Sequence, residues 1–341
     1  MDKQLFYIYT PAIRLNSAGI RVLHYLCDAL NQNGQDAWLV LHNPKEILNP
    51  TDPELNTPII SQQQVNKHLA EGRTPTVIYS ETVPGNPLKA KRVVRYLLHF
   101  PGALGGAEKF TSSEWLVAYS KKIMYSVTNC NEALFLPAVK ISELPPIQKK
   151  DPNLHLMYAG KYRAFVGEPE NPTNLDLVEI HRDGPKKQPR NEVLRLLSKA
   201  TSIYVWENSS ISTEAVLLGT VCIFVPNPFL GELIADYELG TDGISLSLEN
   251  SEIVKARESL PNARMRYLEA QENFQNQLMN FLKKHENWAE NLPIQESLKI
   301  PIISYTINRH RVKLFFSMLK HEGPRKTLRV LREFGYLRFK K

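Results

Sequence analysis

Hydroxyl side chains fill a short stretch between two glutamates near the middle of the chain. The residues concerned are Glu207, Ser209, Ser210, Ser212 and Glu214. A β-branched and aromatic run at 203–206 precedes them, and a continuous apolar run at 221–225 follows. This order predicts a strand, a helix that begins among the serines, and a second strand. Free N–H groups and the positive end of the helix dipole mark such a helix start, so we expect an anion there, with Glu214 beside a group attached to it. The alternative is a turn of this kind that binds nothing.

Basic residues follow two other apolar runs of the same region, at 154–158 and 175–180. They are Lys161, Arg163, His181 and Arg182. Arginine offers a planar fork of donors and lysine a mobile point charge, and both suit phosphate oxygens. The competing interpretation is a solvated strand end.

The elements that must position these residues form two series. The chain has 341 residues, which is long for one domain and comfortable for two. Strand and helix patterns alternate from residue 5 onward, and the alternation restarts after a proline-rich stretch at 144–153. The sequence therefore predicts an α/β fold with two Rossmann-like domains that face each other across a cleft. We assign residues 1–143 to the first domain, 144–153 to a linker, 154–300 to the second domain and 301–341 to a basic helical tail.

Positive charge is concentrated in that tail. The net charge is +7, but residues 301–341 hold eleven Lys/Arg against two acids, which is +9 and leaves −2 for the remainder. Apolar residues are interleaved with the basic ones, so the tail is expected either to bind an anionic membrane surface or to pack back on the first domain with a solvated basic face.

Cysteine usage and the N-terminus indicate the compartment. The three cysteines, Cys27, Cys130 and Cys222, are widely spaced in apolar surroundings, as in core residues of a reducing compartment. The N-terminus has no signal-peptide pattern, and no apolar run reaches the length of a membrane span. We expect a cytoplasmic protein. If the tail binds the membrane, the protein would be peripheral on the inner face of the cell membrane.

Several of these segments together resemble a known family. The segment 158–163 resembles the diphosphate-contact region of GT-B glycosyltransferases of the family-four (group 1) branch, the bacterial surface-polysaccharide type. The segment 207–219 is similar to the paired-glutamate signature of that branch, although its two glutamates are one residue closer. The pattern Ser17-Ala-Gly-Ile resembles the start of the acceptor domain. The resemblance covers about residues 150–250 well and the first half loosely.

The resemblance implies a glycosyltransferase, hexosyl or related, that moves a sugar from a nucleotide-sugar donor to a glycan or lipid-linked acceptor in cell-surface polysaccharide synthesis. The basic residues and serines would then hold the diphosphate, and Glu214 would accept hydrogen bonds from the ribose. Negative charge develops on the leaving phosphate, and protein cations would stabilise it. The sequence contains no Asp-x-Asp turn or metal-ligand spacing, so we expect neither a metal nor a cofactor.

The first domain should supply any general base. Glu81 follows the predicted strand 76–79, and His99 precedes a Pro-Gly turn. We rank these two above the other polar residues, and a retaining enzyme would need neither. Ser17, Gly19 and Asn86 are expected to shape the acceptor side of the cleft.

Two other functions remain open at this stage. A nucleotide-sugar epimerase on the same fold would share the donor site but need no acceptor surface. A nucleic-acid-binding protein could use the basic tail. The net negative body and the lack of a nucleic-acid-binding module argue against nucleic acid as a partner.

Overall fold

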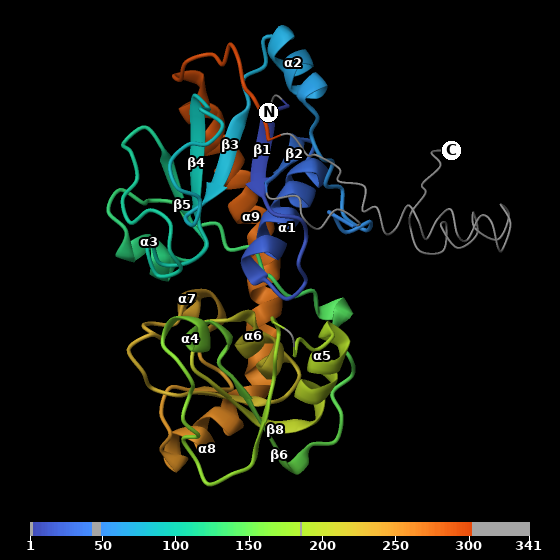
Figure 1. Ribbon diagram of the computed structural model, residues 1–341, viewed down its shortest axis with the longest axis vertical. Helices are drawn as coiled ribbons and strands as arrows, with labels where there is room; N and C mark the ends of the chain where they lie inside the picture. Colours follow the sequence, from blue (N-terminus) through green and yellow to red (C-terminus); the bar gives the residue numbers. More distant parts are fainter. Residues whose placement is uncertain (1–2, 43–48, 185, 302–341) are drawn as a thin grey trace, which may run out of the picture.

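Two parallel sheets of five strands form the framework of the protein (Figure 1). The computed structural model describes residues 3–42, 49–184 and 186–301. The order in the first sheet is β2 (Asp36–Leu41), β1 (Leu5–Thr10), β3 (Thr76–Ser80), β4 (Arg92–Leu97) and β5 (Trp115–Ala118). The order in the second is β10 (Ile244–Ser245), β9 (Val221–Phe224), β8 (Ala200–Val205), β6 (Asp151–Tyr158) and β7 (Leu177–Glu179). The predicted pair of Rossmann-like domains is confirmed, whereas the predicted tail lies outside the described residues.

Helices cover the faces of both sheets. The α-helices are α1 (Ala18–Gln32), α2 (Gln62–Ala70), α3 (Lys121–Ser126), α4 (Gly160–Phe165), α5 (Arg190–Lys199), α6 (Ser210–Leu217), α7 (Asp236–Leu239), α8 (Asn250–Ser259) and α9 (Ala263–Glu290), with short 3₁₀ turns η1 (Ile141–Glu143) and η2 (Leu260–Asn262). Strands covered on both faces must be apolar throughout, and β3 is accordingly buried at every position. Of the described helices, none is long and apolar enough to cross a membrane.

Helix α9 begins on the second domain and ends on the first (Figure 1). Its residues Leu278, Phe281 and Leu282 belong to the hydrophobic core of the first sheet. The Phe281 ring stacks on Trp115 of β5 with centroids 5.2 Å apart. One uninterrupted helix thus joins the two cores. The end of α9, which the sequence assigns to the second domain (154–300), therefore packs in the first domain.

The chain crosses between the domains before the proline-rich stretch. Val139 packs against Leu217 and Tyr267 of the second half. The side-chain amine of Lys150 donates to the carbonyls of Leu197, Ser198 and Leu218 at 2.7–3.3 Å. Lys150 therefore already lies on the second domain. Strand β6 starts at Asp151, inside the range 144–153 assigned to the linker. The prolines thus mark an extended lead into β6, and the crossing lies at about 139–143.

Candidate functional site

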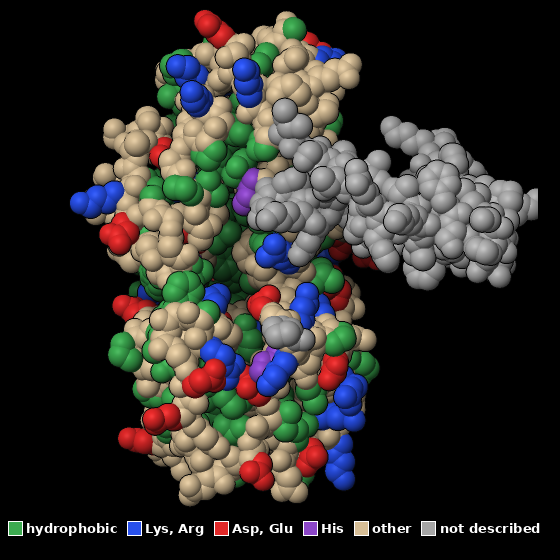
Figure 2. Space-filling view, viewed as in Figure 1, with side chains coloured by type: hydrophobic (Ala, Val, Ile, Leu, Met, Phe, Trp, Pro, Cys, Tyr) green, Lys and Arg blue, Asp and Glu red, His purple; other side chains and the backbone are tan. Residues whose placement is uncertain are grey.

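A cavity of about 440 Å³ separates the carboxyl ends of the two sheets and is lined from both domains. Figure 2 shows the surface hollowed between the two halves, with hydrophobic side chains in the recess. Ligands of open α/β sheets bind at this edge of the strands. The predicted site residues that line the cavity are Ser17, Gly19, Glu81, His99, Lys161, Ser209, Ser210 and Ser212.

Glu81 directly follows β3 and is only 3% exposed. Its Oε2 accepts the N–H of Leu98 at 2.8 Å. Burial raises the pKa of this carboxyl to about 7, against the opposing effects of backbone N–H bonds and the charge of Arg95. A carboxylate with such a pKa in a cavity is suited to take up a proton near neutral pH.

His99 follows β4 and lines the same cavity. Its Nδ1 accepts the N–H of Phe100 at 2.9 Å, so in the neutral ring the proton is on Nε2. Burial, with the charge of Lys161, lowers the pKa of His99 to about 4. The ring is therefore neutral at pH 7, and of the two predicted bases Glu81 has the pKa better matched to that role.

Gly106 holds the loop after His99 against the loop after β3. Its φ is 88°, and a Cβ at this position would lie 2.4 Å from the carbonyl oxygen of Glu81. A side chain here would push the two loops apart and change the position of Glu81.

Lys161 and Glu207 meet on the second domain. Glu207 Oε2 accepts the backbone N–H groups of Lys161 and Tyr162 (2.9 Å to Tyr162) at the start of α4. The Lys161 amine donates to the carbonyl of Asn208 at 3.0 Å and lies 3.9 Å from Glu207 Oε1. Burial lowers the pKa of Lys161, which the nearby Glu207 opposes.

Glu207 also borders a second cavity, of about 250 Å³, that includes Lys161 and His99. The buried Oε1 of Glu207 has no hydrogen-bond partner. A buried carboxylate oxygen that has an ion-pair partner at 3.9 Å but no hydrogen bond can accept one from a ligand hydroxyl.

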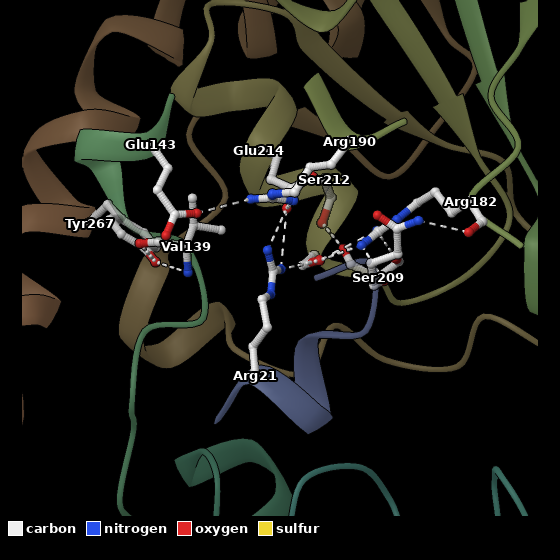
Figure 3. Close-up of polar contacts among 11 residues, drawn as sticks. Arg21, Val139, Glu143, Arg182, Arg190, Ser209, Ser212, Glu214 and Tyr267 are labelled. Carbon is white, nitrogen blue, oxygen red and sulfur yellow. Dashed lines mark hydrogen bonds and ion pairs between the residues drawn. The ribbon is translucent and has the colours of Figure 1, made fainter. Parts of the chain in front are cut away.

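Arginines gather around the start of α6 (Figure 3). Arg182 donates to Ser209 Oγ at 3.1 Å and to Ser210 Oγ at 3.4 Å, and Arg21 donates to Ser210 Oγ at 3.0 Å. Arg182 also donates to the carbonyl of Asn16 in the first domain. The hydroxyl oxygens act as acceptors toward the guanidinium groups, and Ser209 also hydrogen-bonds the side chain of Tyr158. The expected cationic helix start is present.

Glu214 of α6 meets Arg21 and Arg190 (Figure 3) and is not among the residues that line the cavity. It is 0% exposed, and its Oε1 accepts from Arg190 at 2.7 Å and from Arg21 at 3.2 Å. Burial would raise its pKa, but the charges of Arg182, Arg21 and Arg190 outweigh burial and lower it. The ribose contact predicted for Glu214 is not supported by this geometry, because the carboxylate is inaccessible and its Oε1 is already paired with two arginines.

Besides Glu207 and Glu214, four predicted residues lie outside the lining of this cavity: Arg163, His181, Arg182 and Asn86. Arg163 forms ion pairs with Glu168, at 2.7 Å, and with Glu179. Its guanidinium, predicted to bind phosphate, is therefore engaged by two carboxylates. His181 Nε2 lies 3.7 Å from Glu179. Asn86 accepts from the hydroxyl of Tyr79 at 3.0 Å and donates to the carbonyl of Ala90 at 2.8 Å, so it organises its own loop.

Ser212 and Arg21 both differ from what the sequence predicts. Ser212 lines the cavity, but its hydroxyl donates to the carbonyl of Ser209 at 2.8 Å and supports the first turn of α6. Arg21 was not among the predicted site residues. The available signal was a charged residue on the apolar stripe of α1, where Val22, Leu23 and Leu26 are buried.

The described residues contain no group of three His, Cys, Asp or Glu side chains that could hold a metal ion. Metal independence stays a prediction.

No protein-family model matches the chain, and no curated protein matches it in sequence. Solved structures similar to it include a glycosyltransferase from Rickettsia africae ESF-5, with 9% identity and a TM-score of 0.49 over 85% of this chain and 100% of that one. The glycosyltransferase SnogD from Streptomyces nogalater has 12% identity and a TM-score of 0.43, covering 82% and 99%. WaaG, a glycosyltransferase involved in lipopolysaccharide biosynthesis, has 14% identity and a TM-score of 0.36, covering 80% and 95%. TM-scores below 0.5 at such identities identify neither substrate nor reaction.

Proposed function

We propose that the protein is a glycosyltransferase that moves a sugar from a nucleotide-sugar donor to an acceptor hydroxyl. One observation carries the proposal: Glu81 of the first domain and Lys161 of the second line the same interdomain cavity. A group that accepts a proton thus faces a group that can neutralise a leaving phosphate.

The second domain supplies the donor side. The diphosphate would lie at the start of α6, against Ser209, Ser210 and the amine of Lys161. These donors and the helix dipole are fixed before the reaction, so they stabilise the charge that grows on the leaving phosphate without reorganisation. The free Oε1 of Glu207 would accept a hydrogen bond from a hydroxyl of the transferred sugar.

The first domain supplies the acceptor side. Glu81 takes the proton of the acceptor hydroxyl while that oxygen bonds to C1 of the sugar. The bond from C1 to the phosphate oxygen breaks, and its electron pair goes to the diphosphate. A single displacement of this kind inverts the configuration at C1, which the anomeric coupling constants of the product would report.

Wider aspects of the function remain proposals. The acceptor that we propose from the sequence is a glycan or a lipid-linked molecule, and the pathway is bacterial cell-surface polysaccharide synthesis. Transfer is proposed to need no metal. Attachment of the basic tail to an anionic membrane is proposed from its composition alone, since residues 302–341 lie outside the described part of the chain.

A thermal-shift screen against UDP, GDP, ADP, CMP and dTDP sugars tests the donor site, with Lys161→Ala as the site variant. We expect one nucleotide class to raise the Tm of the wild-type protein and this shift to shrink in Lys161→Ala. Lys255→Ala, which removes an exposed lysine on α8, is the matched control and should keep the full shift. Absence of a shift with every nucleotide sugar would contradict the proposed function.

A further inference from the structure

Part of the lining of the cavity is apolar, and the space against it is here named the apolar chamber. Its walls are the side chains of Tyr119, Phe135, Val139, Ile234, Leu239 and Tyr267. The first three belong to the first domain and the last three to the second. No step of the proposed sugar transfer uses them.

Hydrogen bonds from backbone N–H groups connect the segment of Glu81 to a strand end of the apolar chamber. Glu81 accepts the N–H of Leu98, and the neighbouring carbonyl of Leu97 accepts the N–H of Tyr119 at 2.8 Å. The rings of Tyr119 and Phe135 lie 4.8 Å apart between centroids. Because Glu81, Tyr119 and Phe135 line the same cavity, a molecule whose hydroxyl reaches Glu81 can place another part of its structure against these rings.

Several polar groups that border the apolar chamber are already paired. The Tyr267 hydroxyl donates to the carbonyl of Val139 and accepts its N–H, both at 2.8 Å. The carbonyl of Ile234 accepts from the hydroxyl of Ser120. These paired groups offer little to a ligand hydroxyl or to water, whereas the buried Oδ1 of Asp236, which also lines the cavity, has no hydrogen-bond partner.

Ion pairs between the domains border this region of the cleft. Lys122 of α3 lies 2.8 Å from Glu232 and 3.0 Å from Asp236 of the second domain. The N–H of Lys121 donates to Glu238 at 2.8 Å. Together with the Ser120 contact, these ties hold α3 on α7 and keep Ile234 and Leu239 in place as one wall of the apolar chamber.

Protein interiors rarely leave apolar space unfilled, and water gains few hydrogen bonds in such space. An apolar group that enters the chamber removes its surface from water, which is favourable in proportion to the area buried. A glycan hydroxyl placed against these apolar walls would lose hydrogen bonds to water.

We propose that the acceptor carries an apolar group, aromatic or aliphatic, next to its reacting hydroxyl, and that this group occupies the apolar chamber. The proposal rests on the proposed function and selects among its acceptors: the part of the acceptor beside the reacting hydroxyl is apolar and not a bare glycan.

Ligand-observed saturation-transfer NMR with benzyl alcohol tests the apolar chamber without any donor. Ile234→Trp fills it from one wall, and Val254→Trp, on the exposed face of α8, is the matched control. We expect saturation transfer to benzyl alcohol in the wild-type protein and in Val254→Trp, and a clear loss in Ile234→Trp. Leu239→Phe is the second filling variant if circular dichroism shows that Ile234→Trp does not fold. Equal signals in the wild-type and the folded filling variant would overturn the proposal.

Transfer assays then compare benzyl alcohol with glucose as acceptors, using the donor found by the thermal-shift screen. We expect kcat/KM for benzyl alcohol to exceed that for glucose by about tenfold, Ile234→Trp to remove this preference, and Val254→Trp to keep both the preference and donor hydrolysis. Donor hydrolysis with no preference between the acceptors would overturn the apolar-acceptor proposal alone. Benzyl alcohol binding without donor binding or hydrolysis would instead contradict the proposed function.

Discussion

Glu81 and Glu214 are buried carboxylates on opposite sides of the same cleft, and their chemistry differs because their neighbours differ. Glu81 is 3% exposed and Glu214 0% exposed. Burial dominates at Glu81 and raises its pKa to about 7, whereas at Glu214 the charges of Arg182, Arg21 and Arg190 outweigh burial and lower the pKa. The position of cations, more than burial, decides which carboxylate can exchange a proton at neutral pH.

The same difference separates a role in the reaction from a role in the architecture. Arg21 belongs to α1 of the first domain, and Glu214 belongs to α6 of the second, so their pair ties the two domains (Figure 3). Arg190 extends the tie toward Glu143 in η1, at 4.0 Å. Glu214 therefore holds the cleft together, while Glu81 faces the space inside it.

Removal of the proposed base should have the largest effect. In Glu81→Gln the cavity keeps its shape but loses the proton acceptor, so we expect transfer to fall by about 10²–10⁴-fold with donor binding retained. Glu132→Gln is the control, since Glu132 is also buried but pairs with Lys284 away from the cavity. Transfer within a few-fold of wild type would remove Glu81 from the mechanism.

Glu214→Gln should mainly affect stability. It leaves the buried guanidinium groups of Arg21 and Arg190 without their shared anion, so we expect the free energy of unfolding at pH 7 to fall by about 3–5 kcal/mol in urea titrations. The stability due to ionised Glu214 is fully present above its unfolded pKa and is lost as pH falls below it, because the folded pKa is the lower one. Glu258→Gln on the surface of α8 should change little. A variant as stable as wild type would refute the proposed interdomain tie.

Glu81→Gln should stabilise the protein at alkaline pH. The folded pKa of Glu81 is about 7 against an ordinary value of 4.5, so its ionisation in the folded state costs free energy as pH rises through 7. That difference corresponds to about 3 kcal/mol, which the variant should gain at pH 8 and not at pH 4. Urea unfolding of both proteins at the two pH values measures it, and equal stability at pH 8 would argue against a raised pKa.

Tyr267→Phe should have the smallest of these effects. The variant removes the hydroxyl that pairs with both peptide groups of Val139 at the crossing between domains. Leaving these buried groups unpaired should cost about 1–2 kcal/mol in the free energy of unfolding. Tyr237→Phe, at an exposed tyrosine, serves as the reference. A larger loss in the reference variant would exclude a special role for the Val139 contact.

The sequence predicts the sheets and the start of α6 well because those signals are local. The apolar run of β3 identifies the position of Glu81, and the serines identify the helix start. The partner of Glu214 could not be predicted, since Arg21 is 193 residues away in the chain. Helix α9 joins two cores through one unbroken pattern, so its crossing between domains leaves no boundary signal. The competition between burial and charge at each carboxylate likewise depends on the folded arrangement.

The pH dependence of kcat/KM tests the central claim most directly, because it reports the ionisation of groups in the free enzyme. If Glu81 is the base, log kcat/KM for the wild-type protein should rise with pH and level off above an inflection near pH 7. Glu81→Gln should retain a low rate without that inflection. An unchanged inflection in Glu81→Gln, or a wild-type profile that is flat between pH 5 and pH 8, would contradict the assignment of Glu81 as the general base.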